Sequence, residues 1–301
     1  MIAAILSAIL PVFLVVGLAF VVRRRFTLDA KTLSTLNIYL FIPCLVFADL
    51  SQRRLEWAVF ARYAGGAVLM LLCMTALLRF VAWLRGLDGA PQSAFMMTMF
   101  MNLGNFGLPL CKFAFGDEGL ALAVVVMVCG SFLQNSVGVY FAQRTHYTVS
   151  ESFRRVLKLP MMYAFALALI SQRTGFQLPL TAFRAIRITA DAAIPIQLMI
   201  LGILLAETRL DTRANVFIAT AVRLCAGPVL ALCLATVLGL EGLAAKVFIL
   251  QMSGPVAVGM SAYGVQFDVE PRFLASVVSW SFLCSILSVS TVLLVLSKLS
   301  F

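Results

Sequence analysis

Two short stretches inside apolar segments carry the residues best suited to bind a small molecule. The first reads MNLGNFGLPLCK, residues 101–112, and the second reads LQMSGPVAVGM, residues 250–260; each contains one proline, Pro109 or Pro255. A proline inside a helix removes a hydrogen-bond donor and clashes with the carbonyl one turn earlier, at a cost of roughly 3 kcal/mol or more. In lipid, the freed backbone groups must be satisfied by protein or water. We therefore expect a helix break in each stretch, with non-helical backbone at about residues 104–109 and 253–256, facing a protein-lined or water-filled cavity.

The residue types around these breaks predict a site for a small anion. Half-helix N-termini would point partial positive charge at the breaks, and amide side chains would add hydrogen-bond donors without a fixed ion pair. The alternative is that both prolines simply kink their helices. The residues expected to form the substrate site are Asn102, Asn105, Gly107, Pro109, Lys112, Asn135, Gln197, Gln251, Ser253, Gly254 and Pro255.

Several of these polar residues have a second interpretation. Gln134 and Asn135 differ by about 100° around a helix, so at most one is expected to contact substrate, and both could instead bond neighbouring helices. Lys112 could attract a carboxylate or act as a proton-linked switch, but it could also be an ordinary interfacial lysine. Asn37 and Gln197 belong to neighbouring helices that could cover the breaks.

The composition places these residues in a membrane. The chain is 62% hydrophobic and 12% charged, with a mean hydropathy of +1.02, whereas soluble domains carry roughly 25% charged residues. The net charge of +10 comes from short basic clusters between apolar runs, so nucleic acid is not an expected partner. The seven cysteines have no paired spacing and His146 is the only histidine, so we expect no disulfide framework, metal or cofactor.

A spanning helix needs about 20 apolar residues, and the sequence predicts an all-α polytopic membrane protein with ten such helices. The predicted spans are 2–22, 31–50, 56–80, 92–115, 118–141, 156–171, 183–206, 214–238, 242–265 and 272–297. The two breaks fall in the fourth and the ninth.

The basic residues outside the spans predict the orientation of the chain. Each loop is given the number of the predicted span that it follows. Thirteen Lys and Arg lie in the odd-numbered loops and eight on the opposite side, if Arg62 and Arg223 inside helices are left out. Cytoplasmic loops carry the excess of Lys and Arg. We therefore expect cytoplasmic odd loops and, in a bacterial inner membrane, periplasmic termini.

The two halves of the chain contain matching motifs. ARYAGGAVLMLLC in the third span aligns with VRLCAGPVLALCL in the eighth, FGDEG with FDVEP, CGSF with SWSF, and FIPCLVF with AIPIQLM. The matches keep one order along the chain and predict a first repeat at 1–145 and a second at 146–301. Five spans per repeat would invert the second copy, an arrangement common in secondary transporters with interrupted helices.

The first of these alignments pairs Arg62 with Arg223. Both lie well inside their helices, and we expect their long side chains to reach the lipid headgroups. The alternative is that the two arginines form a symmetric pair that anchors each repeat or attracts anions at each vestibule.

The motifs NLGNFGLPL, IPCLVF and YGVQFDVEP resemble the auxin efflux carrier family, in its bacterial branch, and the resemblance covers essentially the whole chain. It implies ten helices in two inverted five-helix repeats, crossed broken helices four and nine with Pro109 and Pro255 at the crossing, and an elevator-like movement. It also implies an organic-acid substrate, because plant members carry auxin and bacterial members are similar to carriers of malate and malonate. One departure is that Val256 to Val258 are apolar, where bacterial members often have further polar residues.

We therefore expect a secondary transporter that moves small organic anions by alternating access. The alternatives are a channel, a sodium- or proton-coupled carrier of related fold, and an intramembrane enzyme. An enzyme is not expected, because His146 lies in a polar loop and SGPVAVGMS lacks the Gly-x-Ser-x-Gly motif. The expected partners are a small organic acid and the lipid bilayer, with a homodimer as one possible assembly.

Overall fold

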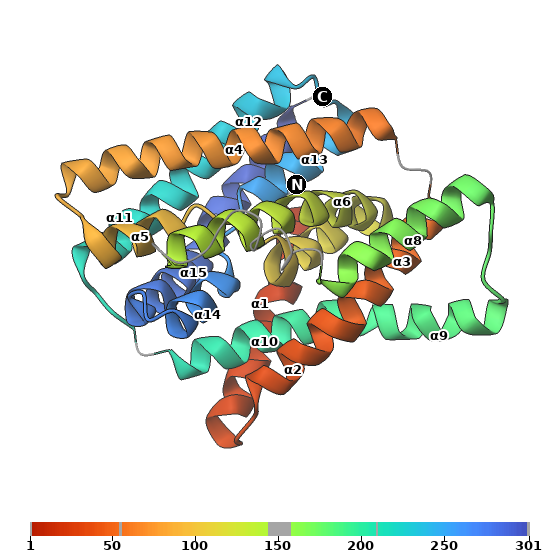
Figure 1. The fold of residues 1–301 in the computed structure, drawn as a ribbon, viewed down its shortest axis with the longest axis horizontal. Helices are drawn as coiled ribbons and strands as arrows, with labels where there is room; N and C mark the ends of the chain where they lie inside the picture. Colours follow the sequence, from red (N-terminus) through yellow and green to blue (C-terminus); the bar gives the residue numbers. More distant parts are fainter. Residues whose placement is uncertain (1, 54–55, 144–157, 209, 300–301) are drawn as a thin grey trace.

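The described part of the chain is a bundle of helices. The structure is a computed structural model that describes residues 2–53, 56–143, 158–208 and 210–299 (Figure 1). Beside the helices, these residues form one isolated β-bridge. The helices are α1 (Ile2–Arg25), α2 (Ala30–Leu36), η1 (Asn37–Phe41), α3 (Ile42–Ser51), α4 (Trp57–Leu84), α5 (Gly89–Met97), η2 (Leu103–Gly107), α6 (Leu108–Gln143), α8 (Pro160–Thr174), α9 (Leu180–Asp191), α10 (Ala193–Glu207), α11 (Ala214–Ala221), η3 (Val222–Ala226), α12 (Gly227–Val237), α13 (Gly242–Met252), α14 (Val258–Gln266) and α15 (Pro271–Lys298), where η1, η2 and η3 are π-helical.

Seven helical segments of the described residues are long and apolar enough to cross a membrane. They are Ile5–Arg25, Ala30–Ser51, Trp57–Leu84, Leu103–Ala142, Leu180–Glu207, Ala214–Val237 and Pro271–Lys298. This makes the chain an integral membrane protein, as its composition predicts. The prediction of ten spans additionally needs the shorter helices α5, α8, α13 and α14, and it stays a prediction. The predicted boundary between the repeats, at residues 145 and 146, lies outside the described residues.

The longest of these segments contains one abrupt bend. Gly116 has φ 68° and ψ −156° inside α6, a conformation that a side chain at this position would strain. The bend coincides with the predicted boundary between the fourth and fifth spans, at residues 115–118.

Both predicted breaks are present, but one lies elsewhere than expected. The second falls between α13 and α14, at residues 253–257, as the sequence predicts. The first falls between α5 and η2, at residues 98–102, and not at 104–109. Residues 103–107 are π-helical and continue directly into α6, whose second residue is Pro109. Pro109 therefore lies within the helical segment that follows the break and does not mark the break itself.

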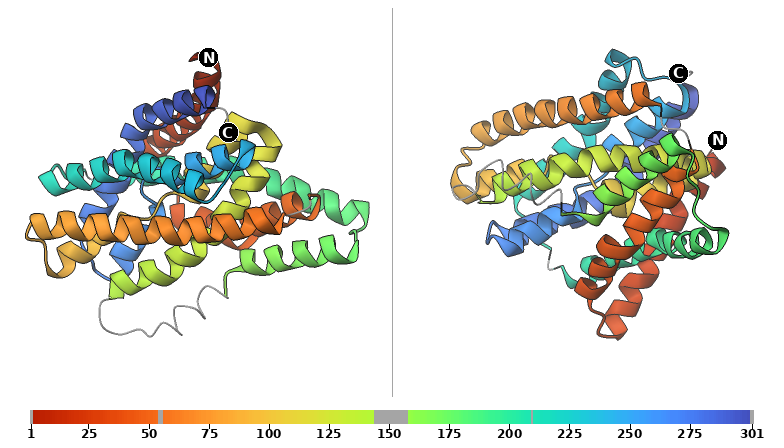
Figure 2. Two further views of the ribbon diagram at one scale, coloured as in Figure 1. Left: turned by 90° about the horizontal axis from the view of Figure 1, so that it is seen from above. Right: turned by 45° about the vertical axis from the view of Figure 1, so that its right-hand side comes forward.

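The helices pack as two bodies. In the first, α1 lies along α10, and α3 lies on α8 and α9; the second contains α4, α5, α6 and the helices from α11 to α15. Figure 1 shows α3, α8 and α9 together on the right, and Figure 2 shows the same grouping from two other sides. The first body is tightly packed at Gly202, where an added Cβ would lie 2.3 Å from the carbonyl oxygen of Val16. The bodies touch where α1 meets α6 and α15, and where α10 meets η2.

Polar contacts join residues in or beside the odd-numbered loops to one another. The pairs are Arg23 with Glu207 at 2.9 Å, Arg85 with Asn215 at 3.1 Å, and Arg213 with Glu270 at 3.1 Å. Four of the odd loops therefore lie at one end of the molecule, as an alternating topology requires. Which side of the membrane this end faces stays a prediction.

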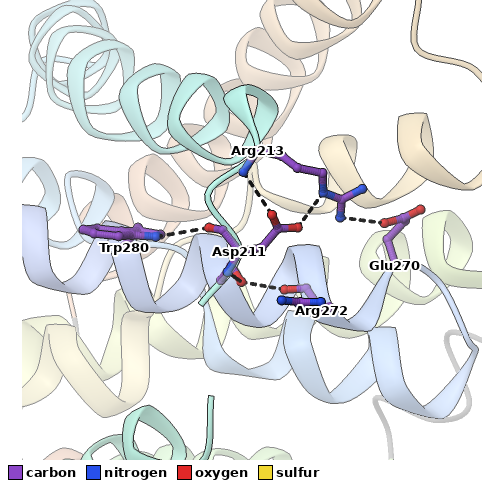
Figure 3. A network of polar contacts seen from close by, with 6 residues as sticks. Asp211, Arg213, Glu270, Arg272 and Trp280 are labelled. Carbon is purple, nitrogen blue, oxygen red and sulfur yellow. Dashed lines mark hydrogen bonds and ion pairs between the residues drawn. The ribbon is translucent and has the colours of Figure 1, made fainter. Parts of the chain in front are cut away.

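The segment between α10 and α11 is fixed to α15 by the network in Figure 3. Asp211 accepts hydrogen bonds from the backbone N–H and the guanidinium of Arg213, its own N–H donates to Ser276 Oγ at 2.7 Å, and its carbonyl accepts from Trp280 at 3.3 Å. Burial raises the pKa of the Asp211 carboxyl, but the two bonds from Arg213 outweigh it and hold this pKa below its ordinary value. The network attaches the connecting segment to the second body.

Candidate functional site

The two interruptions cross and are hydrogen-bonded to each other. The N–H of Asn102 donates to the carbonyl of Pro255, and the N–H of Ala257 donates to the carbonyl of Phe100, both at 2.8 Å. Between these bonds, Met101 and Val256 form an antiparallel bridge. Backbone groups that lost their helical partners are therefore satisfied by the opposite break, which answers the requirement that lipid imposes on an interrupted helix.

Arg223 holds the crossing from one side. Its side chain is fully buried, and it donates to the carbonyl oxygens of Gly254 at 3.0 Å, Met99 at 3.3 Å and Met252. These carbonyls belong to both interruptions. The expectation that Arg223 reaches the headgroups is therefore wrong, because its side chain is fully buried and donates to backbone groups inside the protein.

A cavity of about 300 Å³ lies on one side of the crossing. It is lined by Asn37, Ile38, Ile42, Asn102, Leu103, Gly104, Asn105, Met127, Ser131, Gln134, Asn135, Leu159, Met161, Ala257, Val258, Gly259, Ala262 and Tyr263. The residues from η1, α3 and the start of α8 belong to the first body and the others to the second. The cavity thus lies between the two bodies, and none of its described lining residues carries a formal charge.

Four amide side chains in the cavity are available to a ligand. Asn37, Asn102, Asn105 and Gln134 line it, and within the part of the chain that the structure describes their side chains make no hydrogen bond. Asn37 Oδ1 is fully buried without a partner. Unsatisfied buried polar groups cost free energy, so these amides indicate a site that a polar ligand or water completes.

Asn135 also lines the cavity, but its amide is already used. Its Nδ2 donates to the carbonyl of Ser131 at 2.8 Å, and its Oδ1 accepts from the hydroxyl of Tyr263 at 2.7 Å. Both Gln134 and Asn135 therefore reach the cavity, and Gln134 is the one whose amide remains available.

Two helix N-termini meet the cavity. Val258 and Gly259 are the first residues of α14, and Leu103 and Gly104 begin η2, which continues directly into α6. The first N–H groups of a helix have no helical acceptor and carry partial positive charge. An added Cβ on Gly259 would lie 2.9 Å from Gln134 Nε2, so this amide lies close against the start of α14. The arrangement suits an oxygen-rich anionic group.

Five of the predicted site residues support the crossing and do not line the cavity. An added Cβ on Gly107 would lie 2.0 Å from Gln251 Oε1, and Gln251 Nε2 donates to the carbonyl of Ala123 at 3.3 Å. Gly107 thus leaves room for the buried Gln251 side chain. The remaining three are Ser253, whose Oγ donates to the carbonyl of Ile249 at 2.6 Å, and Gly254 and Pro255, whose carbonyls accept from Arg223 and Asn102.

Three further predicted residues also lie outside the cavity lining. Pro109 is in the first turn of α6. Lys112 forms an ion pair with Asp117, which fits its interpretation as an interfacial lysine. Gln197 is fully buried in α10, and both polar atoms of its side chain lack a partner among the described residues. The structure therefore brings Asn102, Asn105 and Asn135 together around the cavity. Pro109, Lys112 and Gln197 lie outside its lining.

The cavity contains residues that sequence reasoning did not select. Tyr263 was missed, although YGVQFDVEP contains it and it lies one turn beyond Gly259, on the face of α14 that also carries Ala262. Its spacing from the second break was the available signal. Asn37 was expected near the crossing, but its π-helical segment was not visible in the sequence.

Comparison with known proteins identifies the family of the chain. A family model described as "Membrane transport protein" matches residues 4–158 and 142–293. An uncharacterized transporter of Methanothermobacter thermautotrophicus is 25% identical over 293 residues, covering 94% of this chain and 95% of its own length. One of Methanocaldococcus jannaschii is 25% identical over 260 residues, covering 82% and 83%. The "Probable auxin efflux carrier component 1b" of Oryza sativa is 26% identical over 141 residues, covering 44% of this chain and 26% of its own.

The family match spans nearly the whole chain, and the relatives with the greatest coverage are transporters. Together with the apolar helices and the interrupted pair, these matches point to a transporter and not to an enzyme. The chain belongs to the membrane transport protein family that includes the auxin efflux carriers.

Proposed function

We propose that this protein is a secondary transporter of small organic anions, such as carboxylates and auxin-like acids. The observation that carries the proposal is the cavity beside the crossing, where available amides from η1, η2 and α6 face the N-termini of two half-helices. A carboxylate accepts hydrogen bonds only, so amide donors and helix N–H groups match it. The volume of about 300 Å³ lies at the lower end of the range of small-molecule sites.

The apolar part of the cavity lining indicates the chemistry of the rest of the substrate. Ile38, Ile42, Leu103, Met127 and Met161 offer apolar surface beside the amides. The described lining has no carboxylate, the group expected to bind a sodium ion or a proton in an ion-coupled carrier. These features favour an organic acid over an inorganic ion, and they give no support to ion coupling.

The cavity's position between two bodies favours alternating access by an elevator-like movement. The first body supplies Asn37 and the second carries the crossing. Sliding the second body along the first would carry the crossing and a bound anion together across the membrane. The crossing is hydrogen-bonded within the second body, so it can move without being broken.

We also propose ten spans in two inverted five-helix repeats, 1–145 and 146–301. The antiparallel bridge between Met101 and Val256 supports this proposal, because inverted copies bring their broken helices together in opposite directions. With cytoplasmic odd loops, both termini would be periplasmic in a bacterial inner membrane.

Uptake by the purified protein in proteoliposomes tests the proposed function. The panel is malate, malonate and indole-3-acetate, each radiolabelled. We expect uptake of at least one acid, and we expect Asn102→Ala and Asn105→Ala to weaken its apparent affinity by roughly tenfold to a hundredfold, because a hydrogen bond to a charged group contributes about 1.5–3 kcal/mol.

Two control variants accompany these. Asn215→Ala makes the same chemical change far from the cavity, where Asn215 accepts from Arg85 at 3.1 Å, and Lys112→Gln removes a cation that pairs with Asp117. Both should transport like the wild type. Wild-type protein that transports none of the acids refutes the proposal, and wild-type kinetics from both cavity variants places the site elsewhere.

A further inference from the structure

Arg223 is a buried cation without an acidic partner. None of the ion pairs among the described residues includes it, and its side chain is fully buried. It donates to the three backbone carbonyls of Met99, Met252 and Gly254. A buried charge that nothing compensates is strongly disfavoured, so these carbonyls must supply the compensation.

The three carbonyls lie at the C-terminal ends of the two half-helices that precede the breaks. α5 ends at Met97, two residues before Met99, and α13 ends at Met252. The C-terminus of a helix carries a partial charge of about −0.5 elementary charges. Two such ends amount to about one negative charge, which one guanidinium offsets.

This offset changes what the cavity presents to a ligand. The N-termini of η2 and α14 lie within a few residues of the same C-terminal ends, and without a cation the two sets of partial charges would oppose each other. With Arg223 in place, the negative ends are compensated and the positive ends remain. The guanidinium lies beside the crossing but is not part of the described cavity lining.

We infer that Arg223 is a positioning residue that makes the cavity selective for anions. It acts through the crossing: it compensates the C-terminal ends of α5 and α13, so that the N-termini facing the cavity attract a carboxylate. The inference rests on the proposed function and adds to it the residue that determines the sign of the substrate's charge.

The local structure explains how the side chain is held. Arg223 belongs to η3, and Gly227 one turn later leaves room for it, because an added Cβ there would lie 3.2 Å from the guanidinium carbon. Arg62, which the sequence pairs with Arg223, has a different place. It donates to the carbonyl of Gly239 at 2.6 Å in an exposed contact, so it provides a matched control.

The test compares an acid with its own amide. For each acid of the panel that the wild type transports, we measure how strongly the unlabelled acid and its neutral amide compete with uptake of the labelled acid. The variants are Arg223→Gln, Arg223→Lys and Arg62→Gln. We expect the preference for the acid over its amide to fall at least tenfold in Arg223→Gln. We expect this preference to be retained in Arg223→Lys, even if its maximal rate is lower, and to be unchanged in Arg62→Gln.

A folded Arg223→Gln protein that keeps the wild-type preference overturns the inference while the proposed function stands. If Arg223→Gln does not fold, Arg223→Lys decides, because a tenfold loss of preference despite a retained charge also overturns it. A wild type that transports none of the acids refutes the proposed function and this inference with it.

Discussion

Amide side chains give the cavity its chemistry, because Asn37, Asn102, Asn105 and Gln134 have hydrogen-bonding groups that are not used inside the described chain. An amide carries no charge, so it can hold an anion without binding it as tightly as a buried ion pair would. A carrier has to release its substrate in every cycle. Neutral donors beside helix N-termini are therefore a suitable basis for transport.

The lack of a side chain at Gly107 allows Gln251 to pack against η2 at the crossing. We expect Gly107→Ala to destabilise the protein by roughly 1–3 kcal/mol, the usual cost of overpacking, because its Cβ would lie 2.0 Å from Gln251 Oε1 and the Gln251 side chain would have to move. The measurement is the thermal melting of the purified protein in detergent.

Gly65→Ala is the matched control, since an added Cβ there meets nothing within 4 Å and alanine favours a helix. It should melt at or above the wild-type temperature. Equal melting of Gly107→Ala and wild type would contradict the close packing of Gln251 against η2.

At the scale of elements, three π-helical segments each carry one polar residue that lines the cavity or binds the crossing. η1 carries Asn37, η2 carries Asn105 and η3 carries Arg223. π-helical turns occur frequently at functional sites, because the extra residue turns a side chain away from the regular helical face. The two interrupted helices and these three segments together place the polar groups at one crossing.

The crossing itself can be tested with a disulfide. Met101 and Val256 form a bridge whose flanking hydrogen bonds leave them as a non-hydrogen-bonded pair, and the Cα atoms of such pairs lie about 4.5 Å apart. This is within the range for a disulfide. We expect Met101→Cys with Val256→Cys, in a cysteine-free background, to cross-link on mild oxidation, detected by mass spectrometry of the linked peptides.

The control for this disulfide is Met101→Cys with Cys233 restored, which should stay reduced, because Met101 is buried at the crossing whereas Cys233 is exposed on α12. Failure of the 101–256 pair to oxidise would contradict the crossing.

The existence of the two helix interruptions can be predicted from the sequence more accurately than their positions and contacts. Proline, glycine and polar residues within apolar stretches indicate both breaks, and the position predicted for the second is confirmed. The position predicted for the first is several residues too late, because Pro109 does not cause the break but lies in the helical segment after it. The roles of Arg223 and Tyr263 depend on contacts between segments far apart in the chain, which residue types and spacing do not reveal.

At the scale of the whole molecule, the two bodies meet through a short aromatic contact. The rings of Phe13 on α1 and Phe282 on α15 stack with centroids 4.7 Å apart, and Phe282 also contacts Phe106 of η2 at 5.9 Å. Phe13 belongs to the first body and the other two to the second. An elevator-like movement would have to slide this contact.

We therefore expect a cross-link between the bodies to stop transport. Phe13→Cys with Phe282→Cys, bridged by a short bifunctional thiol reagent, should abolish uptake, and uptake should return when the link is reduced. The 101–256 disulfide lies within one body and should leave uptake largely intact. Full transport by the bridged 13–282 protein would contradict movement of one body against the other.

The central claim is that the cavity beside the crossing carries an organic anion across the membrane by alternating access, and counterflow tests it most directly. Proteoliposomes are loaded with a high concentration of an unlabelled acid of the panel and diluted into a trace of the same acid carrying a radioactive label. The account predicts that wild-type protein accumulates the label transiently above its equilibrium level, and that Asn102→Ala reduces this overshoot while Asn215→Ala does not. Entry of the label that only rises to equilibrium, without an overshoot, would indicate a channel and contradict the account.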